Sequence, residues 1–294
     1  MSELTVIIPT YNRSEPLKGT LNSLQETENH PAEVIVVDDS EEDTTQQVCE
    51  NHEYKINYIR PAKSINLPHA RNVALEAAET DIVAFVDDDV RFSDGWCDAI
   101  LESFQKDDVG AVGGPALEYT EGCLKHARSE SNENQNTVTK EGFVDDSSAY
   151  WRPSNPVETD TLRGANMAFR KSVLEEIGGF DEGYIGNSFR EDTDICVRVK
   201  DKGYRIIYDP KAELEHLYID EGGCRDKNRD FWYSLGYNQR RFVTKNFASK
   251  TRLNLIKFGF TWDYTPYSLL KIILSAIKNH EFKRLAYVKG LIGR

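Results

Sequence analysis

The chain has 294 residues and a formal net charge of −13 at neutral pH. Hydrophobic residues make up 39% and charged residues 29% of it, a composition typical of folded globular proteins that argues against disorder and against an integral membrane protein. The length suits one large α/β domain with an appendage, or two domains. Because the chain is acidic, nucleic acid is not expected as a partner.

The N-terminus and the cysteines indicate the compartment. Met1 is followed almost directly by an apolar run without a signal peptide, and no stretch approaches the roughly 20 apolar residues that cross a bilayer. The five cysteines are odd in number and contain no CxxC pair, so neither a disulfide framework nor a zinc ribbon is indicated. These features predict reduced thiols and a cytoplasmic protein.

Basic residues are concentrated at the C-terminal end. Residues 240–294 contain 12 Lys or Arg and two acidic residues, which predicts a boundary between a body of residues 1–239 and a basic, helical extension. Two interpretations of the extension stay open: residues 265–294 lie as an amphipathic helix on an anionic membrane surface, or they pack on the body or on a second copy in a homodimer. The apolar residues behind this prediction are Leu269, Leu270, Ile272, Ile273, Leu274 and Ile277, then Phe282, Leu285, Val288 and Ile292.

Regular elements follow one another in an alternating order. Three β-branched apolar runs, Leu4–Ile8, Val34–Val37 and Ile82–Val86, are separated by segments with helical periodicity, which is typical of βαβ units and a parallel sheet. A first helix is expected through Leu17, Leu21 and Leu24, with Ser14 as its cap. Further strands are expected at Tyr54–Ile59, Val109–Tyr119 (interrupted at Gly113), Tyr204–Tyr208 and Glu213–Tyr218, and further helices at His69–Glu79, Asp94–Lys106, Lys171–Ile177 and Glu191–Lys202.

Acidic residues directly follow two of these strands. Asp38 and Asp39 end one, and Asp87, Asp88 and Asp89 end the other, at the edge of an open α/β sheet where ligands bind. Three consecutive carboxylates repel one another unless a cation is close, and their oxygens suit Mg²⁺ or Mn²⁺. The triplet therefore predicts a metal site for a diphosphate; the alternative is a solvated acidic turn that caps the next helix.

Several motifs together resemble the family 2 glycosyltransferases, which share the GT-A fold and include rhamnosyl- and glucosyltransferases. Their order and spacing match over roughly residues 4–218, and residues 219–294 carry no match. The matching segments are residues 6–13, 36–39, 70–72, 85–89, 164–166, 168–170, 178–182, 191–192 and 203–204. The resemblance implies a Rossmann-like, mostly parallel sheet flanked by helices, with a nucleotide-binding half (residues 1–120) and an acceptor-binding half (residues 121–239).

The same resemblance implies roles for individual residues. Asp192 would be the general base on the acceptor, with Glu191 beside it, and Asp89, Asp87 and His216 would hold the metal. The donor would be bound by Pro9, Thr10, Tyr11, Arg13, Asp39, Arg71, Asp87, Asp88 and Asn166. Simpler roles stay open for several of them: packing for Tyr11 and His216, a surface ion pair for Arg71, and a helix cap for Asp192.

The implied activity is inverting transfer of one sugar from a nucleotide-diphosphate sugar, with UDP-sugars favoured, to a hydroxyl or lipid-phosphate acceptor. The acceptor would be a glycan or a polyprenyl- or dolichyl-linked lipid in cell-surface or glycoprotein glycan assembly, at the cytoplasmic face of a membrane if the extension binds there. The Gln-x-x-Arg-Trp motif of processive synthases is absent, since residues 239–242 differ in spacing and aromatic residue. A sugar nucleotidyltransferase, which would want a Gly-rich loop in place of residues 9–13, and a non-catalytic sugar-nucleotide-binding protein are the alternatives.

Overall fold

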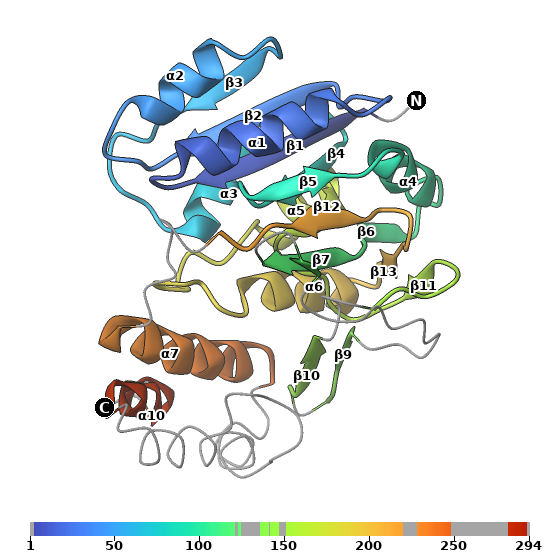
Figure 1. Ribbon diagram of the computed structural model, residues 1–294. Coiled ribbons are helices and arrows are strands. Elements are labelled where there is room, and N and C mark those ends of the chain that lie inside the picture. Colours follow the sequence, from blue (N-terminus) through green and yellow to red (C-terminus); the bar gives the residue numbers. More distant parts are fainter. Residues whose placement is uncertain are drawn as a thin grey trace.

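The structure, a computed structural model, describes residues 3–120, 123–124, 136–140, 142–146, 151–219, 228–247 and 282–292 (Figure 1). In chain order its elements are β1 Leu4–Thr10, α1 Ser14–Gln25, β2 Glu33–Asp38, α2 Thr44–Glu50, β3 Ile56–Ile59, α3 Leu67–Ala77, β4 Ile82–Val86, β5 Val90–Phe92, α4 Trp96–Ser103, β6 Val109–Gly113, β7 Ala116–Thr120, β8 Cys123–Leu124, β9 Asn136–Val138, β10 Val144–Asp146, β11 Val157–Glu158, β12 Asn166–Arg170, α5 Lys171–Ile177, α6 Glu191–Asp201, β13 Arg205–Tyr208, β14 Leu214–His216, α7 Arg229–Asn246, the 3₁₀ helix η3 Phe282–Leu285 and α10 Ala286–Ile292.

An eight-stranded sheet forms the centre, in the order β11-β13-β6-β12-β4-β1-β2-β3. Strands β3, β2, β1 and β4 are parallel, as predicted, but β12 runs antiparallel between β4 and β6. The sheet is therefore mixed. Strand β12 was not predicted, because its apolar run is only Met167 to Phe169. Strands from both predicted halves of the body form this one sheet.

Successive side chains of the central strands point to opposite faces of the sheet and contribute to two hydrophobic cores. Val6 and Ile8 of β1 pack with α1 and α4 on one face, whereas Ile7 packs with α3, α5 and α6 on the other. Helix α1 buries an apolar stripe that consists of Leu17, Leu21 and Leu24. The result is a three-layer α/β/α arrangement, with α1 over one face of β1 and β2 (Figure 1).

The ends of several elements correct or refine the predictions. Ser14 does not cap the first helix, because it is the first helical residue and Arg13 occupies the N-cap position without a side-chain hydrogen bond. The predicted strand at Val109–Tyr119 is two strands, β6 and β7, in different sheets. The chain turns between them at Gly114, where a Cβ would lie 2.2 Å from the carbonyl oxygen of Ala212. Only glycine fits this contact.

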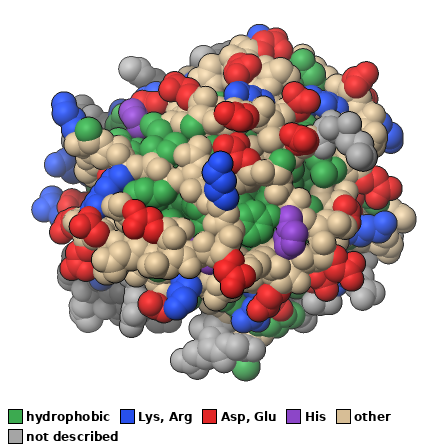
Figure 2. Space-filling view, turned by 90° about the horizontal axis from the view of Figure 1, so that it is seen from above, with side chains coloured by type: hydrophobic (Ala, Val, Ile, Leu, Met, Phe, Trp, Pro, Cys, Tyr) green, Lys and Arg blue, Asp and Glu red, His purple; other side chains and the backbone are tan. Residues whose placement is uncertain are grey.

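Negative charge is spread over the body. Figure 2 shows the face seen from above, toward α1, α2 and β3 in Figure 1, with acidic side chains distributed across it and interspersed with Lys, Arg and apolar side chains. Two acids of the triplet do not belong to this solvated population, because Asp88 is 4% and Asp89 0% exposed. Their burial distinguishes the triplet from a solvated acidic turn.

Helix α7 crosses the predicted boundary between body and extension. It continues without a break from Arg229 to Asn246, so the change in charge near residue 240 does not coincide with the end of an element. Asp181 accepts hydrogen bonds from Arg241 (2.6 and 3.1 Å) and from Lys245 (2.7 Å). Asp194 accepts from Lys245 (2.9 Å) and Asn246 (2.8 Å). Arg241 and Lys245 of the predicted extension thus form ion pairs with acids of the body.

Helix α10 packs on α7 through Ala286, Tyr287 and Leu291, which contact Trp232 and Leu235. This contact agrees with the alternative in which the end of the extension packs on the body. Of the apolar residues behind the prediction, Leu285 is 38% exposed and Val288 is half-buried. The predicted apolar residues between 269 and 277 lie outside the described residues. In the part of the chain that the structure covers, no helix has the length and apolar character needed to traverse a bilayer.

Candidate active site

The acidic triplet occupies the turn between β4 and β5. Strand β4 is fully buried and parallel to β1, so the triplet emerges at the carboxyl end of the sheet. The backbone carbonyl of Asp89 accepts from Leu217 N–H (2.8 Å), and its Oδ2 accepts from Ile219 N–H (3.1 Å). These bonds fix the triplet against the segment that follows β14.

His216 reaches the triplet because β14 pairs antiparallel with β5, with His216 opposite Val90. Its Nε2 lies 3.2 Å from Asp89 Oδ1 and 3.6 Å from Asp87 Oδ2. Asp87, Asp89 and His216 each offer one possible ligand atom, and these three atoms lie within 4.8 Å of one another. Two carboxylates and one imidazole are a set of metal ligands that fits Mn²⁺, so these residues could hold the predicted metal.

Arg13 lies against the same acids. Its Nη2 is 2.7 Å from Asp89 Oδ2 and its Nη1 is 3.3 Å from Asp88 Oδ1. Asp88 also accepts the Thr10 hydroxyl at 2.6 Å. Burial raises the pKa of Asp88 to about 7, against the opposing effect of the Arg13 guanidinium. Arg13 thus pairs with two of the three carboxylates of the triplet, and a cation held by Asp87, Asp89 and His216 would add positive charge beside them.

A cavity of about 510 Å³ adjoins the triplet, a size that suits a small-molecule ligand. Most of the predicted donor-binding residues lie in its wall: Pro9, Thr10, Tyr11, Arg13, Asp39, Asp87 and Asp88. Other wall residues were not predicted from the sequence: Ser64, Ile65, Asn66, Leu67, Ala70, Gly186, Asn187 and Phe231. We call this space the donor cavity.

Asp39 organises one part of the donor cavity. Its carboxylate accepts the Ser64 hydroxyl at 2.8 Å and the Ile65 N–H at 3.2 Å. The loop before α3 is therefore attached to the end of β2. This contact explains how Ser64 and Ile65, which carry no motif, reach the cavity.

Arg71 and Glu191 do not lie in the wall of the donor cavity. Both are buried and form an ion pair, and the Arg71 guanidinium also lies over the rings of Phe85 (5.9 Å) and Phe180 (5.4 Å). Burial raises the pKa of Glu191 to about 7, whereas Arg71 opposes this shift. Arg71 therefore does form an ion pair, but the simpler interpretation placed that pair on the surface and the structure places it in the interior.

Asp192 opens α6 in a half-buried position beside this pair. Its Oδ2 accepts the Gly164 N–H at 3.1 Å, and its Oδ1 accepts the Thr193 N–H at 2.7 Å. Arg71 donates to the Gly164 carbonyl at 3.1 Å. The buried pair therefore supports the turn that orients Asp192.

Asn166 is not brought into the site. Its Oδ1 accepts the Trp96 indole N–H at 3.0 Å, and its amide donates to the carbonyls of Pro115 (3.2 Å) and Ala212 (2.7 Å). The side chain is 0% exposed. Its hydrogen bonds join the central sheet to α4 and to the chain before β14, which corrects the prediction that it binds the donor.

Left-handed backbone conformations occur next to the site. Among the described non-glycine residues, positive φ angles occur at Asn12 (54°), Ser188 (51°), Arg190 (75°) and Tyr218 (51°). Asn12 precedes Arg13, Arg190 precedes Glu191, and Tyr218 follows His216 by two residues. Such strained conformations concentrate at functional sites, and nothing in these residue types signalled them.

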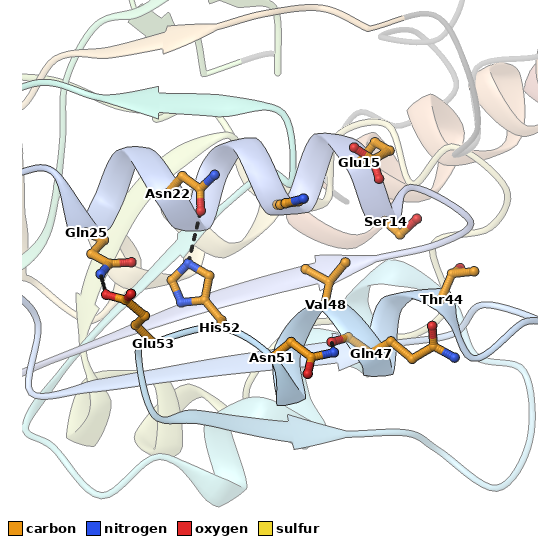
Figure 3. Close-up of a pocket in the computed structure, with 11 residues that line it drawn as sticks. Ser14, Glu15, Asn22, Gln25, Thr44, Gln47, Val48, Asn51, His52 and Glu53 are labelled. Carbon is orange, nitrogen blue, oxygen red and sulfur yellow. Dashed lines mark hydrogen bonds between the residues drawn. The ribbon is translucent and has the colours of Figure 1, made fainter.

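A second cavity, of about 580 Å³, lies between α1 and α2 (Figure 3). Its polar side chains pair with one another across the groove: Asn22 with His52 (3.3 Å) and Gln25 with Glu53 (2.7 Å). It contains none of the residues predicted to bind donor or metal. The candidate site is therefore the donor cavity with the triplet beside it.

Comparison with known proteins agrees with this geometry. A model of "Glycosyl transferase family 2" matches residues 5–178, and a model of "N-terminal domain of galactosyltransferase" matches residues 147–219. The O-antigen chain rhamnosyltransferase WbaN of Salmonella anatum is 28% identical over 74% of this chain and 67% of its own length. The pre-mycofactocin glycosyltransferase of Mycobacterium tuberculosis is 30% identical over 73% of this chain, which spans 42% of that protein.

Among solved structures, that of GalNAc-T7 with UDP, GalNAc and Mn²⁺ superposes with a TM-score of 0.69 at 14% identity, over 96% of this chain and 56% of that one. The fold is therefore the GT-A fold of nucleotide-sugar glycosyltransferases, as the resemblance implied. Because the family model matches more than half of its residues, this chain belongs to glycosyl transferase family 2.

Proposed function

We propose that this chain is an inverting, metal-dependent glycosyltransferase that moves one sugar from a nucleotide-diphosphate sugar to a hydroxyl or lipid-phosphate acceptor. The observation that carries the proposal is the convergence of Asp87, Asp89 and His216 on one point beside the donor cavity. A bound Mg²⁺ or Mn²⁺ would supply positive charge for the diphosphate leaving group. UDP-sugars are favoured, in line with the UDP and Mn²⁺ named for the GalNAc-T7 structure.

Asp192 is the proposed general base. It would remove the proton of an acceptor hydroxyl while that oxygen attacks the anomeric carbon, and the bond from this carbon to the diphosphate oxygen breaks, with inversion. The Gly164 and Thr193 amides hold the carboxylate in place. Arg71 and Glu191, buried behind this turn, are positioning residues in the proposal, because neither lines the donor cavity.

The acceptor is proposed from the relatives. The Salmonella relative acts on an O-antigen chain by its name, which supports a glycan or lipid-linked acceptor in cell-surface glycan assembly. Peripheral membrane contact through residues 265–294 stays a proposal for the part of the extension that lies outside the described residues.

A thermal-shift panel of UDP-, GDP- and TDP-sugars, each with and without Mn²⁺, tests the proposal. A ligand at 100 times its dissociation constant stabilises the folded state by about 2.7 kcal/mol. One nucleotide series should raise the unfolding temperature, and only with Mn²⁺ present. If no nucleotide sugar stabilises the chain with Mn²⁺, the proposed function is wrong.

A further inference from the structure

One wall of the donor cavity comes from the C-terminal part of the chain. Gly186, Asn187 and Phe231 line it together with the residues at the ends of β1 and β2. Phe231 belongs to α7, beyond residues 5–178 and 147–219 that the two family models match. The motifs of the sequence do not reach it either.

We propose that α7 is a donor-recognition element, in which Phe231 contacts the nucleotide sugar and Asn238 positions the loop that carries Gly186 and Asn187. The proposal rests on the proposed function, since it takes the donor cavity to be the nucleotide-sugar site. It assigns to the C-terminal region a part in substrate binding that a simple extension would not have.

Phe231 is fixed at the first turn of α7. Its N–H donates to the side chain of the N-cap residue Asn228 at 2.9 Å, and its ring packs edge-on against Trp232 at a centroid distance of 5.6 Å. The ring is half-buried, so one part of it remains available at the cavity wall. An aromatic ring held in this way offers a flat apolar surface to a nucleobase or to the apolar face of a sugar.

Asn238 attaches α7 to the loop beside it. Its side chain is 0% exposed, and it bonds both main-chain groups of Ile185: Oδ1 accepts the N–H at 3.0 Å and Nδ2 donates to the carbonyl at 2.8 Å. Nδ2 also lies 3.4 Å from Asn187 Oδ1, which accepts the Ser234 hydroxyl at 3.3 Å. These bonds fix the backbone just before the two wall residues.

The approach of helix and loop depends on Gly186. Its φ angle is +58°, and a Cβ there would lie 2.7 Å from the Ser234 hydroxyl oxygen. On its other side the loop is held by Asn66, which donates to the carbonyls of Glu182 (2.8 Å) and Tyr184 (2.9 Å). A displacement of α7 would therefore displace a wall of the donor cavity.

Calorimetric titration of the full chain in the presence of Mn²⁺ tests the proposal. UDP, GDP, TDP and their sugars are the probes for the wild type. The nucleotide that binds the wild type most tightly, free and as its sugar, is then titrated into the variants. Phe231→Leu should weaken binding about 5- to 100-fold, as expected for loss of aromatic stacking, with little change in unfolding temperature. Tyr233→Leu is the matched control, because Tyr233 is half-buried in the same helix but does not line the cavity. It should bind like the wild type.

Asn238→Ala should weaken binding at a temperature where the variant is fully folded. Because this variant can fail to fold, Ser234→Ala is the second test. It removes the hydroxyl whose proton is shared between the Phe231 carbonyl (2.9 Å) and Asn187 Oδ1 (3.3 Å), and it should weaken binding about 2- to 5-fold. If Phe231→Leu weakens the binding of nucleotide sugars but not of the free nucleotide, Phe231 contacts the sugar. If it weakens the binding of both, Phe231 contacts the nucleotide. Both results support the proposal. Wild-type affinity in Phe231→Leu overturns it, whereas a wild type that binds no nucleotide overturns the proposed function itself.

Discussion

Asp192 and Glu191 are neighbours in the sequence but have different surroundings. Glu191 is buried against Arg71, whereas Asp192 is half-buried and held by two backbone amides. The resemblance implied Asp192 as the general base with Glu191 beside it. The sequence could not show that Glu191 is paired with Arg71, because Arg71 lies 120 residues away along the chain. Burial and pairing make Glu191 a structural support for its neighbour.

Substitution at these two positions should separate activity from stability. Asp192→Asn keeps the shape but loses the proton-accepting charge, so turnover should fall by roughly 10² to 10⁴ while donor binding and unfolding temperature stay close to wild type. Glu191→Gln leaves the buried Arg71 without a charged partner and should cost about 3 kcal/mol of stability, the lower end for a broken buried ion pair. Single-turnover rates and thermal unfolding measure the two effects. If Asp192→Asn also loses affinity for the donor, the assignment of Asp192 as the general base is wrong.

Individual elements differ in how well the sequence predicted them. The β-branched runs at β1, β2 and β4 were predicted because long apolar segments identify buried parallel strands. Strands β5 and β12 were missed, since each offers a short run beside polar residues. Helix α7 was missed because its buried face mixes apolar residues with polar ones such as Ser234, Asn238 and Gln239, which weakens the apolar periodicity.

The contact between α7 and α10 gives a test at the level of elements. A Cβ at Gly236 would lie 2.0 Å from the carbonyl oxygen of Tyr287 in α10. Gly236→Ala should therefore lower the free energy of unfolding by about 1–3 kcal/mol, since backbone cannot yield as a side chain can. Gly19→Ala in α1 is the control: no atom lies within 4 Å of its added Cβ, and it should stabilise the chain by about 0.5–1 kcal/mol. Chemical denaturation of both variants measures the difference. Equal effects would mean that the two helices do not pack this closely.

At the scale of the whole molecule, the topology creates the site. The parallel order β3-β2-β1-β4 places Asp39 and the triplet at the same edge of the sheet, and the pairing of β14 with β5 adds His216. The sequence could predict the first of these relations, because carboxyl ends of parallel strands meet at one edge. It could not predict that the loop before α6 and helix α7 complete the donor cavity, since hydrogen bonds such as that of Asn238 to Ile185 depend on the folded arrangement.

The proposed function depends most directly on the metal site. The rate at which the enzyme consumes the nucleotide-sugar donor, measured in Mn²⁺ and in EDTA for the wild type and for Asp89→Asn, tests it. Asp89 contributes to the group with Asp87 and His216 and is fully buried, so its replacement by a neutral side chain of the same shape should remove metal binding and leave the fold intact. Circular dichroism of the variant should match that of the wild type. We expect the wild type to consume the donor in Mn²⁺ and not in EDTA, and we expect Asp89→Asn to be inactive in both. Full wild-type activity in EDTA, or an Asp89→Asn variant as active as the wild type, would contradict it.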